Sequence, residues 1–217
     1  MNLEQARFNM IEQQIRPWDV LDAHVLHLLS VVKREDFVPI AHKALAFVDM
    51  EIPLAGGQVM LAPRVEARLL QDLAVQKHEK VLEIGTGSGY MAALLAHRAQ
   101  RVITLEIEAT LATLARTNLQ KAGIHNAEVR HLDGSRGVPA EAPFDIILLS
   151  GSLAELPQSL LTHLKAGGRL AAIVGDEPMM RATFTTRLGD TQFRTAQPWD
   201  TVAPRLRNFP EPSRFSF

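Results

Sequence analysis

The pattern of apolar and polar positions changes character near residue 78. Before this point, residues 3–16, 21–33 and 63–73 carry apolar side chains at the three- and four-residue spacing of a helix. The third of these segments starts with Pro63, and proline suits the first turn of a helix. We therefore predict that residues 1–77 form a segment of amphipathic helices, which must bury their apolar faces on the rest of the protein.

After residue 78, short apolar runs alternate with helical patterns. Strands are predicted at residues 80–84, 101–106, 127–132, 144–150 and 168–174, and helices at residues 90–98, 108–123 and 156–165. Continuously apolar strands separated by helices are typical of a mainly parallel sheet covered on both faces. The expected fold class is therefore α/β, with a doubly wound, Rossmann-like sheet.

The C-terminal part of the chain has a different pattern. Residues 181–199 contain two extended runs about Gly189-Asp190, which predict a β-hairpin at the edge of the sheet. Residues 204–217 carry three arginines and three phenylalanines, and this tail either folds over the site or mediates self-association. We expect one domain over residues 1–217, made of a helical cap (1–77), a cofactor-binding core (78–176), and a hairpin with its tail (177–217).

Composition narrows the class of partner. The net charge is −1, with acidic and basic residues interspersed, so the chain has no broad basic surface for nucleic acid or an anionic membrane. The absence of cysteine excludes disulfides, thiolate zinc sites and a cysteine nucleophile. His78, His125 and His131 lack metal-ligand spacing, so no metal is expected. Without a leader-like or membrane-spanning apolar run, a cytoplasmic location is predicted, and the oligomeric state stays open.

The most informative motif is "VLEIGTGSGY" at residues 81–90. Gly85 permits a tight turn after the strand, while Gly87 and Gly89 let the backbone approach a ligand without an intervening Cβ. A dinucleotide-binding turn would place its third glycine at position 90, which is tyrosine here. The spacing therefore favours a nucleoside ligand with a short charged tail.

Acidic residues close the two following strands. Glu106 ends the second strand, where a carboxylate can accept hydrogen bonds from ribose hydroxyls. Asp133 follows the third strand, where it can accept a hydrogen bond from an adenine amino group. Taken singly, Glu106 could be a negative charge that stabilises the start of the next helix, and Asp133-Gly134 could form an ordinary turn. Three such features at successive strand ends favour a binding site.

These motifs resemble those of S-adenosylmethionine-dependent methyltransferases. The flanking segments are similar to protein-L-isoaspartate O-methyltransferases in particular, and they include "MIEQQIRPWDV", "REDFVP", "IPLAGGQVMLAP", "PFDIILLSG" and "LPQSLLTHLKAGGRL". The resemblance covers nearly the whole chain. It implies S-adenosylmethionine as the cofactor and a protein or peptide as the substrate. It also implies a cofactor site made of Glu83, Gly85, Thr86, Gly87, Gly89, Glu106, Asp133 and Gly134.

The chain departs from this family on the substrate side. The family usually reads G-Q-T-I-S-x-P, and its serine is regarded as the active-site hydroxyl. Here Val59 stands in place of the threonine and Leu61 in place of the serine, so both hydroxyls are missing. Ser150 and Ser152, just after the fourth strand, are the nearest replacements. Val59, Leu61 and Ser150 are therefore the candidate residues at the site of methyl transfer.

The loss of both hydroxyls leaves the acceptor open. A carboxylate is already ionised at neutral pH, so its methylation needs no general base. A missing hydroxyl would remove one hydrogen bond to a charged group, worth about 1.5–3 kcal/mol. The sequence thus favours methylation of a carboxylate on an isoaspartyl protein or peptide. Its alternatives are a divergent methyltransferase with another acceptor and a non-catalytic module that binds S-adenosylmethionine.

Overall fold

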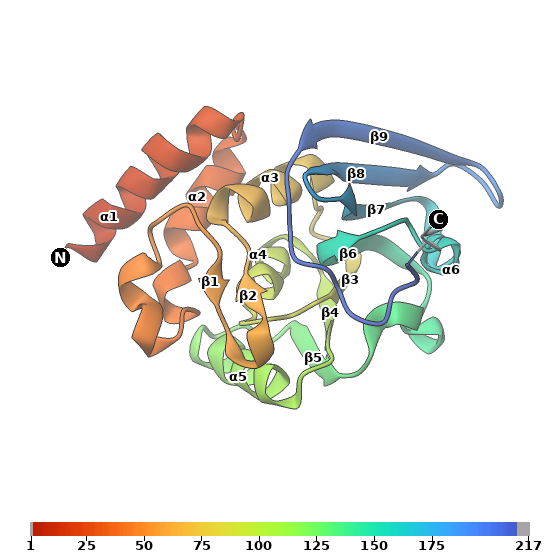
Figure 1. Cartoon of the computed structure of the whole chain (residues 1–217). Coiled ribbons are helices and arrows are strands. Elements are labelled where there is room, and N and C mark those ends of the chain that lie inside the picture. Colours follow the sequence, from red (N-terminus) through yellow and green to blue (C-terminus); the bar gives the residue numbers. More distant parts are fainter. Residues whose placement is uncertain (1, 212–217) are drawn as a thin grey trace, which may run out of the picture.

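A computed structural model describes residues 2–211, and its centre is a seven-stranded sheet with the order β5-β4-β3-β6-β7-β8-β9. Its parallel strands are β3 (Lys80–Ile84), β4 (Arg101–Glu106), β5 (Ala127–His131), β6 (Phe144–Leu153) and β7 (Leu164–Asp176). Strands β8 (Met179–Arg187) and β9 (Phe193–Asp200) form the predicted antiparallel hairpin at one edge (Figure 1). From β3 the chain continues to β4 and β5 on one side of the sheet and then to β6 and β7 on the other. This change of direction places a crevice beyond the carboxyl ends of the strands next to β3.

Helices cover both faces of the sheet. They are α3 (Pro63–Leu73), α4 (Tyr90–Arg98), α5 (Ala109–Lys121) and the short α6 (Gln158–Leu161). Because successive strand side chains point to opposite faces, Val81 belongs to one hydrophobic cluster and Leu82 to the other. Both residues are fully buried. The doubly wound α/β fold expected from the apolar strands is confirmed.

The N-terminal segment is more broken than its periodicity suggests. Helix α1 (Leu3–Met10) passes into a π-helical turn at Ile11–Ile15 and a 3₁₀ turn at Arg16–Trp18, where Pro17 prevents the helix from continuing. Helix α2 (Ala23–Val31) follows, and the short strands β1 (Ile52–Pro53) and β2 (Val59–Met60) pair before α3. Strand β2 therefore carries one of the two positions without a hydroxyl.

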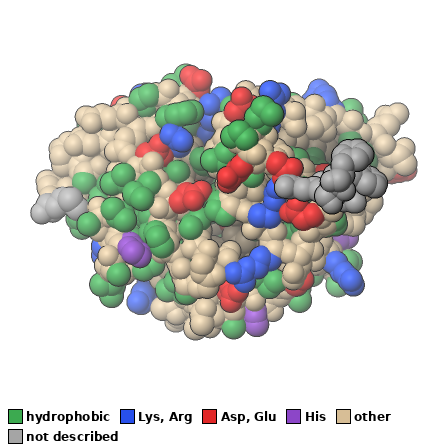
Figure 2. All heavy atoms as spheres, in the orientation of Figure 1, with side chains coloured by type: hydrophobic (Ala, Val, Ile, Leu, Met, Phe, Trp, Pro, Cys, Tyr) green, Lys and Arg blue, Asp and Glu red, His purple; other side chains and the backbone are tan. Residues whose placement is uncertain are grey.

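One hydrophobic cluster joins the N-terminal segment to the sheet. It contains Met10, Leu29 and Leu70 together with Leu94 and Leu148, all of which are buried. Figure 1 shows α1, α2 and α3 beside the sheet, and Figure 2 shows the same face hollowed near its centre. The amphipathic helices therefore bury their apolar sides against the α/β core.

We expect deletion of residues 1–38 to abolish cooperative unfolding. The deletion removes buried side chains such as Met10, Ile15 and Leu29, each of which contributes about 1.5–3 kcal/mol on burial. Several such losses exceed the stability of about 5–15 kcal/mol that a typical domain has. Thermal unfolding followed by circular dichroism is the measurement. A soluble truncated chain with the melting temperature of the parent would show that the cap and the core are separate folding units.

Candidate functional site

The glycine turn forms the floor of a crevice at the carboxyl ends of β3 and β4. Gly85, Gly87 and Gly89 have φ angles of 95°, 55° and 88°, a region that favours glycine. A Cβ on Gly85 would lie 3.2 Å from the Ser150 carbonyl oxygen, so this strand end leaves no room for a side chain. Gly89 serves another purpose, because a Cβ there would lie 3.3 Å from Cα of Ala115 in helix α5.

Two carboxylates stand beside this turn. Glu106 accepts hydrogen bonds from the backbone N–H groups of Gly87 (2.8 Å) and Glu108 (3.0 Å), one on each oxygen. Asp133 accepts from the backbone N–H of Ser135 (2.9 Å), which holds the pKa of Asp133 below its ordinary value, and from the Asn208 side chain (2.8 Å). Each carboxylate oxygen can accept a further hydrogen bond, so both groups are acceptors for a ligand.

The crevice encloses about 530 Å³ of empty space, part of which is open solvent. Five of the residues predicted to bind the cofactor line it, namely Gly85, Gly87, Glu106, Asp133 and Gly134. Its lining also includes Val59 and Ser150, two of the three candidates for the site of methyl transfer. The tertiary structure thus brings together residues that the sequence assigned to separate strand ends.

Residues 203–209, called here the C-terminal segment, cover one side of the crevice. The segment is attached to β6 by hydrogen bonds from Ser152 N to Pro204 O (2.8 Å) and from Leu206 N to Ser152 O (2.9 Å). Arg207 pairs with Glu108 and donates to the Gly56 carbonyl oxygen (2.8 Å). This part of the tail therefore folds over the site, whereas residues 212–217 lie outside the described residues.

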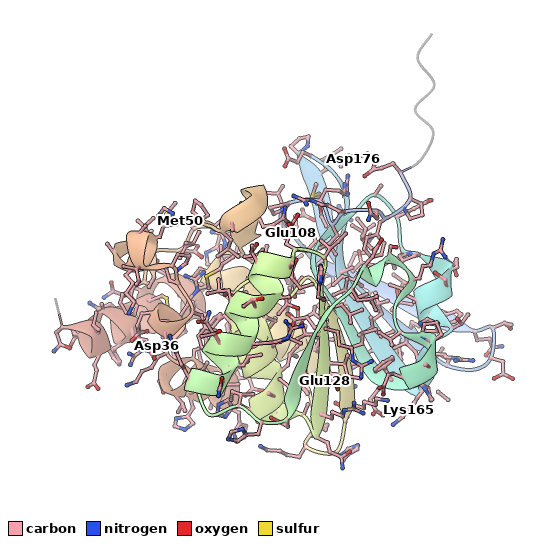
Figure 3. The ribbon with its side chains drawn as sticks, turned by 90° about the horizontal axis from the view of Figure 1, so that it is seen from below. Asp36, Met50, Glu108, Glu128, Lys165 and Asp176 are labelled. Atoms are coloured by element: carbon pink, nitrogen blue, oxygen red, sulfur yellow. The ribbon has the colours of Figure 1, made fainter. Side chains whose placement is uncertain are left out.

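The side-chain view shows which end of the sheet carries these groups. In Figure 3, Met50, Glu108 and Asp176 lie toward one end of the molecule, and Glu128 and Lys165 lie toward the other. Glu108 directly precedes α5 and stands at the crevice end. The crevice is therefore built from loops at the carboxyl ends of the strands, as expected for this fold.

A second, narrow space, called here the inner cavity, adjoins the crevice. Glu83 lines it, is fully buried, and accepts hydrogen bonds from Thr104 Oγ1 (2.7 Å) and Ser150 Oγ (2.8 Å). Burial raises the pKa of Glu83 to about 8, against the opposing effect of these hydrogen bonds. The structure places Glu83 and Thr86 in the inner cavity, whereas the sequence assigned them to the cofactor pocket.

Three buried polar residues in or beside the inner cavity are not among the site residues predicted from the sequence. Glu66 and Tyr90 line the cavity, and neither Glu66 Oε2 nor the Tyr90 hydroxyl has a hydrogen-bond partner among the described residues. Arg34 is fully buried, with its Nε atom 3.6 Å from Glu66 Oε2. A signal for Glu66 was present, because it shares the buried face of α3 with Leu69, Leu70 and Leu73 at helical spacing.

The positions that lack hydroxyls lie between these spaces. Val59 lines both the crevice and the inner cavity. Leu61 is only 7% exposed, and it separates the inner cavity from a wider groove of about 1050 Å³ on the other side. Ser150 lines both the crevice and the inner cavity, with its hydroxyl bonded to Glu83. Ser152 is fully buried, and its hydroxyl has no hydrogen-bond partner among residues 2–211.

The wider groove, called here the outer groove, has aromatic and basic walls. The Arg64 guanidinium lies 4.1 Å from the ring centroid of Trp18, and the Arg68 guanidinium lies 5.0 Å from that of Trp199. Trp18 is 44% exposed, so one large aromatic surface faces solvent. The groove therefore offers a peptide-sized partner apolar surface and side chains of both charges, because Asp49, Glu51 and Asp200 line it beside the two arginines. Leu61 forms part of its wall.

Within residues 2–211, no three histidine or acidic side chains are grouped in a way that could hold a metal ion. None of the helices in that range combines the length and the apolar character needed to cross a membrane. The cytoplasmic location stays a prediction.

Comparison with known proteins gives a consistent result. The sequence model of the family described as protein-L-isoaspartate(D-aspartate) O-methyltransferase (PCMT) matches residues 5–200. The chain is 44% identical over 176 residues to protein-L-isoaspartate O-methyltransferase 1 of Syntrophobacter fumaroxidans, a match that covers 81% of this chain and 82% of the relative. It is 40% identical over 186 residues to protein-L-isoaspartate O-methyltransferase of Rhodopseudomonas palustris, with 85% of each chain covered.

A solved structure shares the fold. It is the crystal structure of a putative protein-L-isoaspartate O-methyltransferase from Plasmodium falciparum in complex with S-adenosyl-L-homocysteine. The TM-score is 0.80 at 19% sequence identity, and the match covers 95% of this chain and 99% of the other.

Proposed function

Because the chain belongs to the protein-L-isoaspartate(D-aspartate) O-methyltransferase family, we propose that it transfers a methyl group from S-adenosylmethionine to the carboxylate of an isoaspartyl residue in a protein or peptide. One observation carries the proposal. The crevice that holds Glu106 and Asp133 shares Val59 with the inner cavity, and Leu61 lines both that cavity and the outer groove. A cofactor and a peptide can thus approach the same point from two sides.

The residues of the crevice fit the cofactor. Each Glu106 oxygen already accepts one backbone hydrogen bond and can accept another, as the two hydroxyls of a ribose require. Asp133 has a lowered pKa and is therefore an ionised acceptor for an adenine amino group. A Cβ on Gly85 or Gly87 would press against Ser150 and Leu206 or against Leu54, so the turn at the crevice requires glycine. When bound, S-adenosylmethionine supplies an electrophilic methyl group on a sulfonium.

The contribution of the protein is positioning and exclusion of water. A carboxylate acceptor is ionised at neutral pH, so no residue has to remove a proton from it. The lining of the outer groove combines Arg64 and Arg68 with Asp49, Glu51 and Asp200, so the groove as a whole is not positive. Its two guanidinium groups can donate hydrogen bonds to an anionic acceptor there. Leu61 and Val59 provide an apolar wall of the inner cavity. Holding the methyl donor and the acceptor carboxylate in contact at this wall lowers the barrier to methyl transfer by orienting them.

Single-turnover transfer of a labelled methyl group tests the proposed function. The acceptor is an isoaspartyl peptide, and its control is the same peptide with ordinary aspartate. We expect transfer to the isoaspartyl peptide at least tenfold faster than to the control. Transfer to another class of acceptor alone would support the divergent methyltransferase. Binding of S-adenosylhomocysteine without transfer to any acceptor would support the non-catalytic module.

We expect the double change Val59→Thr with Leu61→Ser to slow this reaction. Leu61 is buried between two spaces, so a serine there loses about 2–4 kcal/mol of stability and opens the wall to water. A tenfold lower single-turnover rate, or about 1.4 kcal/mol in the barrier, is the expected result. The affinity for S-adenosylhomocysteine is measured in the same preparations. A double variant faster than the parent would show that the missing hydroxyls limit the reaction.

A further inference from the structure

The inner cavity contains a carboxyl group to which the proposed function assigns no role. Glu66 extends from α3 and is 4% exposed. Its Oε2 atom faces Arg34 Nε at 3.6 Å, and neither of these two atoms has a hydrogen-bond partner among the described residues. The Tyr90 hydroxyl at the start of α4 likewise has none. Buried polar atoms without partners are uncommon, and each calls for an explanation. Because both residues line the inner cavity, a ligand that enters it can reach the Tyr90 hydroxyl and the carboxyl group of Glu66.

The nearest cation does not engage Glu66 fully. Arg34 directs Nη1 to the Ala46 carbonyl oxygen (3.1 Å) and Nη2 to the Leu61 carbonyl oxygen (2.8 Å). Only its Nε atom faces Glu66, at 3.6 Å, which is too long for a good hydrogen bond. Arg34 thus supports the backbone of the wall at Leu61 and leaves the Glu66 carboxyl available to the cavity.

Charges on the surrounding elements set the protonation of this carboxyl. Glu83 faces the same cavity from β3, Tyr90 from α4, and Arg34 lies behind Glu66. The ion pair Arg7–Glu35 is buried and internally neutral, and its two charges act on Tyr90 in opposite directions. Burial raises the pKa of Glu66 to about 7, against the opposing effect of Arg34. A neutral carboxyl group differs from an ionised one in having an O–H donor.

We propose that Glu66, as a neutral acid, donates the hydrogen bond to the acceptor carboxylate that Val59 and Leu61 cannot supply. This inference rests on the proposed function, because it requires a carboxylate acceptor. The O–H group of the Glu66 carboxyl takes the place of the missing hydroxyls, because Glu66 lines the same cavity as Val59 and Leu61. Two carboxyl groups in contact share one proton, since both cannot be ionised side by side. A hydrogen bond of this charge-assisted kind is short and strong.

The direction of the pH dependence follows from the role of donor. The donor is present while Glu66 is protonated, and it is lost as the pH rises through the pKa of the free enzyme, which kcat/KM reports. We therefore expect kcat/KM for an isoaspartyl peptide to fall tenfold or more above pH about 7. Glu83 also titrates near this range, so a variant must separate the two groups.

Two variants of nearly the same volume make this separation. Glu66→Gln keeps an N–H donor but does not titrate, so its kcat/KM should stay within threefold of the low-pH value of the parent and lose the decline. Glu66→Met removes the donor, and its kcat/KM should be at least tenfold lower at every pH, with the affinity for S-adenosylhomocysteine changed less than threefold. A purely structural role for Glu66 would not distinguish the two variants by their pH profiles.

Proton uptake provides a readout that does not depend on turnover. The isoaspartyl peptide is titrated at pH 8 into the complex of the enzyme with S-adenosylhomocysteine, in buffers of different ionisation enthalpy. At this pH most Glu66 carboxyls are ionised in the free enzyme, so the parent should take up close to one proton on binding. Glu66→Gln should take up only the fraction of a proton that Glu83 contributes, and so clearly less than the parent.

The outcomes separate the two proposals. Suppose that the parent methylates the isoaspartyl peptide. If Glu66→Met then has the same kcat/KM as the parent, or if Glu66→Gln keeps the decline at high pH, the role of Glu66 is overturned and the proposed function stands. A parent without isoaspartyl transfer overturns both, because the donor then has no carboxylate to serve. If Glu66→Met fails to fold, the pH profile and the proton uptake of Glu66→Gln decide.

Discussion

Replacing Glu106 with alanine should weaken S-adenosylhomocysteine binding at least a hundredfold. The side chain offers one free acceptor position on each oxygen, and hydrogen bonds to a charged group are worth about 1.5–3 kcal/mol each. A loss of about 3 kcal/mol corresponds to roughly a hundredfold in the dissociation constant. The same change leaves the Gly87 backbone N–H without its acceptor, which loosens the turn beneath the ligand.

Isothermal titration calorimetry measures this effect, and Glu108→Ala is the matched control. Glu108 is a neighbouring carboxylate that pairs with Arg207 at the rim. We expect its removal to change the affinity less than fivefold, because exposed ion pairs contribute little. Equal losses in the two variants would mean that Glu106 acts through general charge at the crevice and not through direct hydrogen bonds.

Replacing Arg34 with methionine should lower the free energy of unfolding by about 3–5 kcal/mol, as expected when one partner of a buried charge pair is removed. The fully buried guanidinium donates to the Ala46 and Leu61 carbonyl oxygens, and both would lose their partner. For a chain of this size, such a loss lowers the melting temperature by roughly 10 °C. Denaturant unfolding and differential scanning calorimetry measure the two quantities.

Arg64→Met is the control for this effect, because Arg64 is a partly exposed arginine that also pairs with a carboxylate, that of Asp49. We expect its cost to stay below about 1 kcal/mol. A double-mutant cycle then separates the contribution of Glu66. Glu66→Met should cost less stability in the Arg34→Met background than in the parent, because the unpaired acid has already lost its cation. Additive costs would show that Arg34 stabilises the fold only through its backbone contacts.

The sequence by itself determined the elements that depend on neighbouring residues. The predicted strands at 80–84 and 101–106 and the helix at 63–73 coincide with β3, β4 and α3. Apolar periodicity and turn residues act over a few positions, and the surrounding structure did not override them. The motif at residues 81–90 likewise specified a glycine turn, because a positive φ is a local requirement that glycine meets.

The tertiary structure alone decided what stands around that turn. Arg34, Glu66 and Tyr90 come from three separate elements, and no spacing along the chain relates them. The position of Leu61 between the inner cavity and the outer groove, and the course of residues 203–209 over the crevice, likewise depend on contacts between distant parts of the chain. Periodicity indicates which face of an element is buried, but not which other element covers it. The chemistry of a buried polar group depends on those partners, so the sequence identified the cofactor side of the site and the packed fold decided the acceptor side.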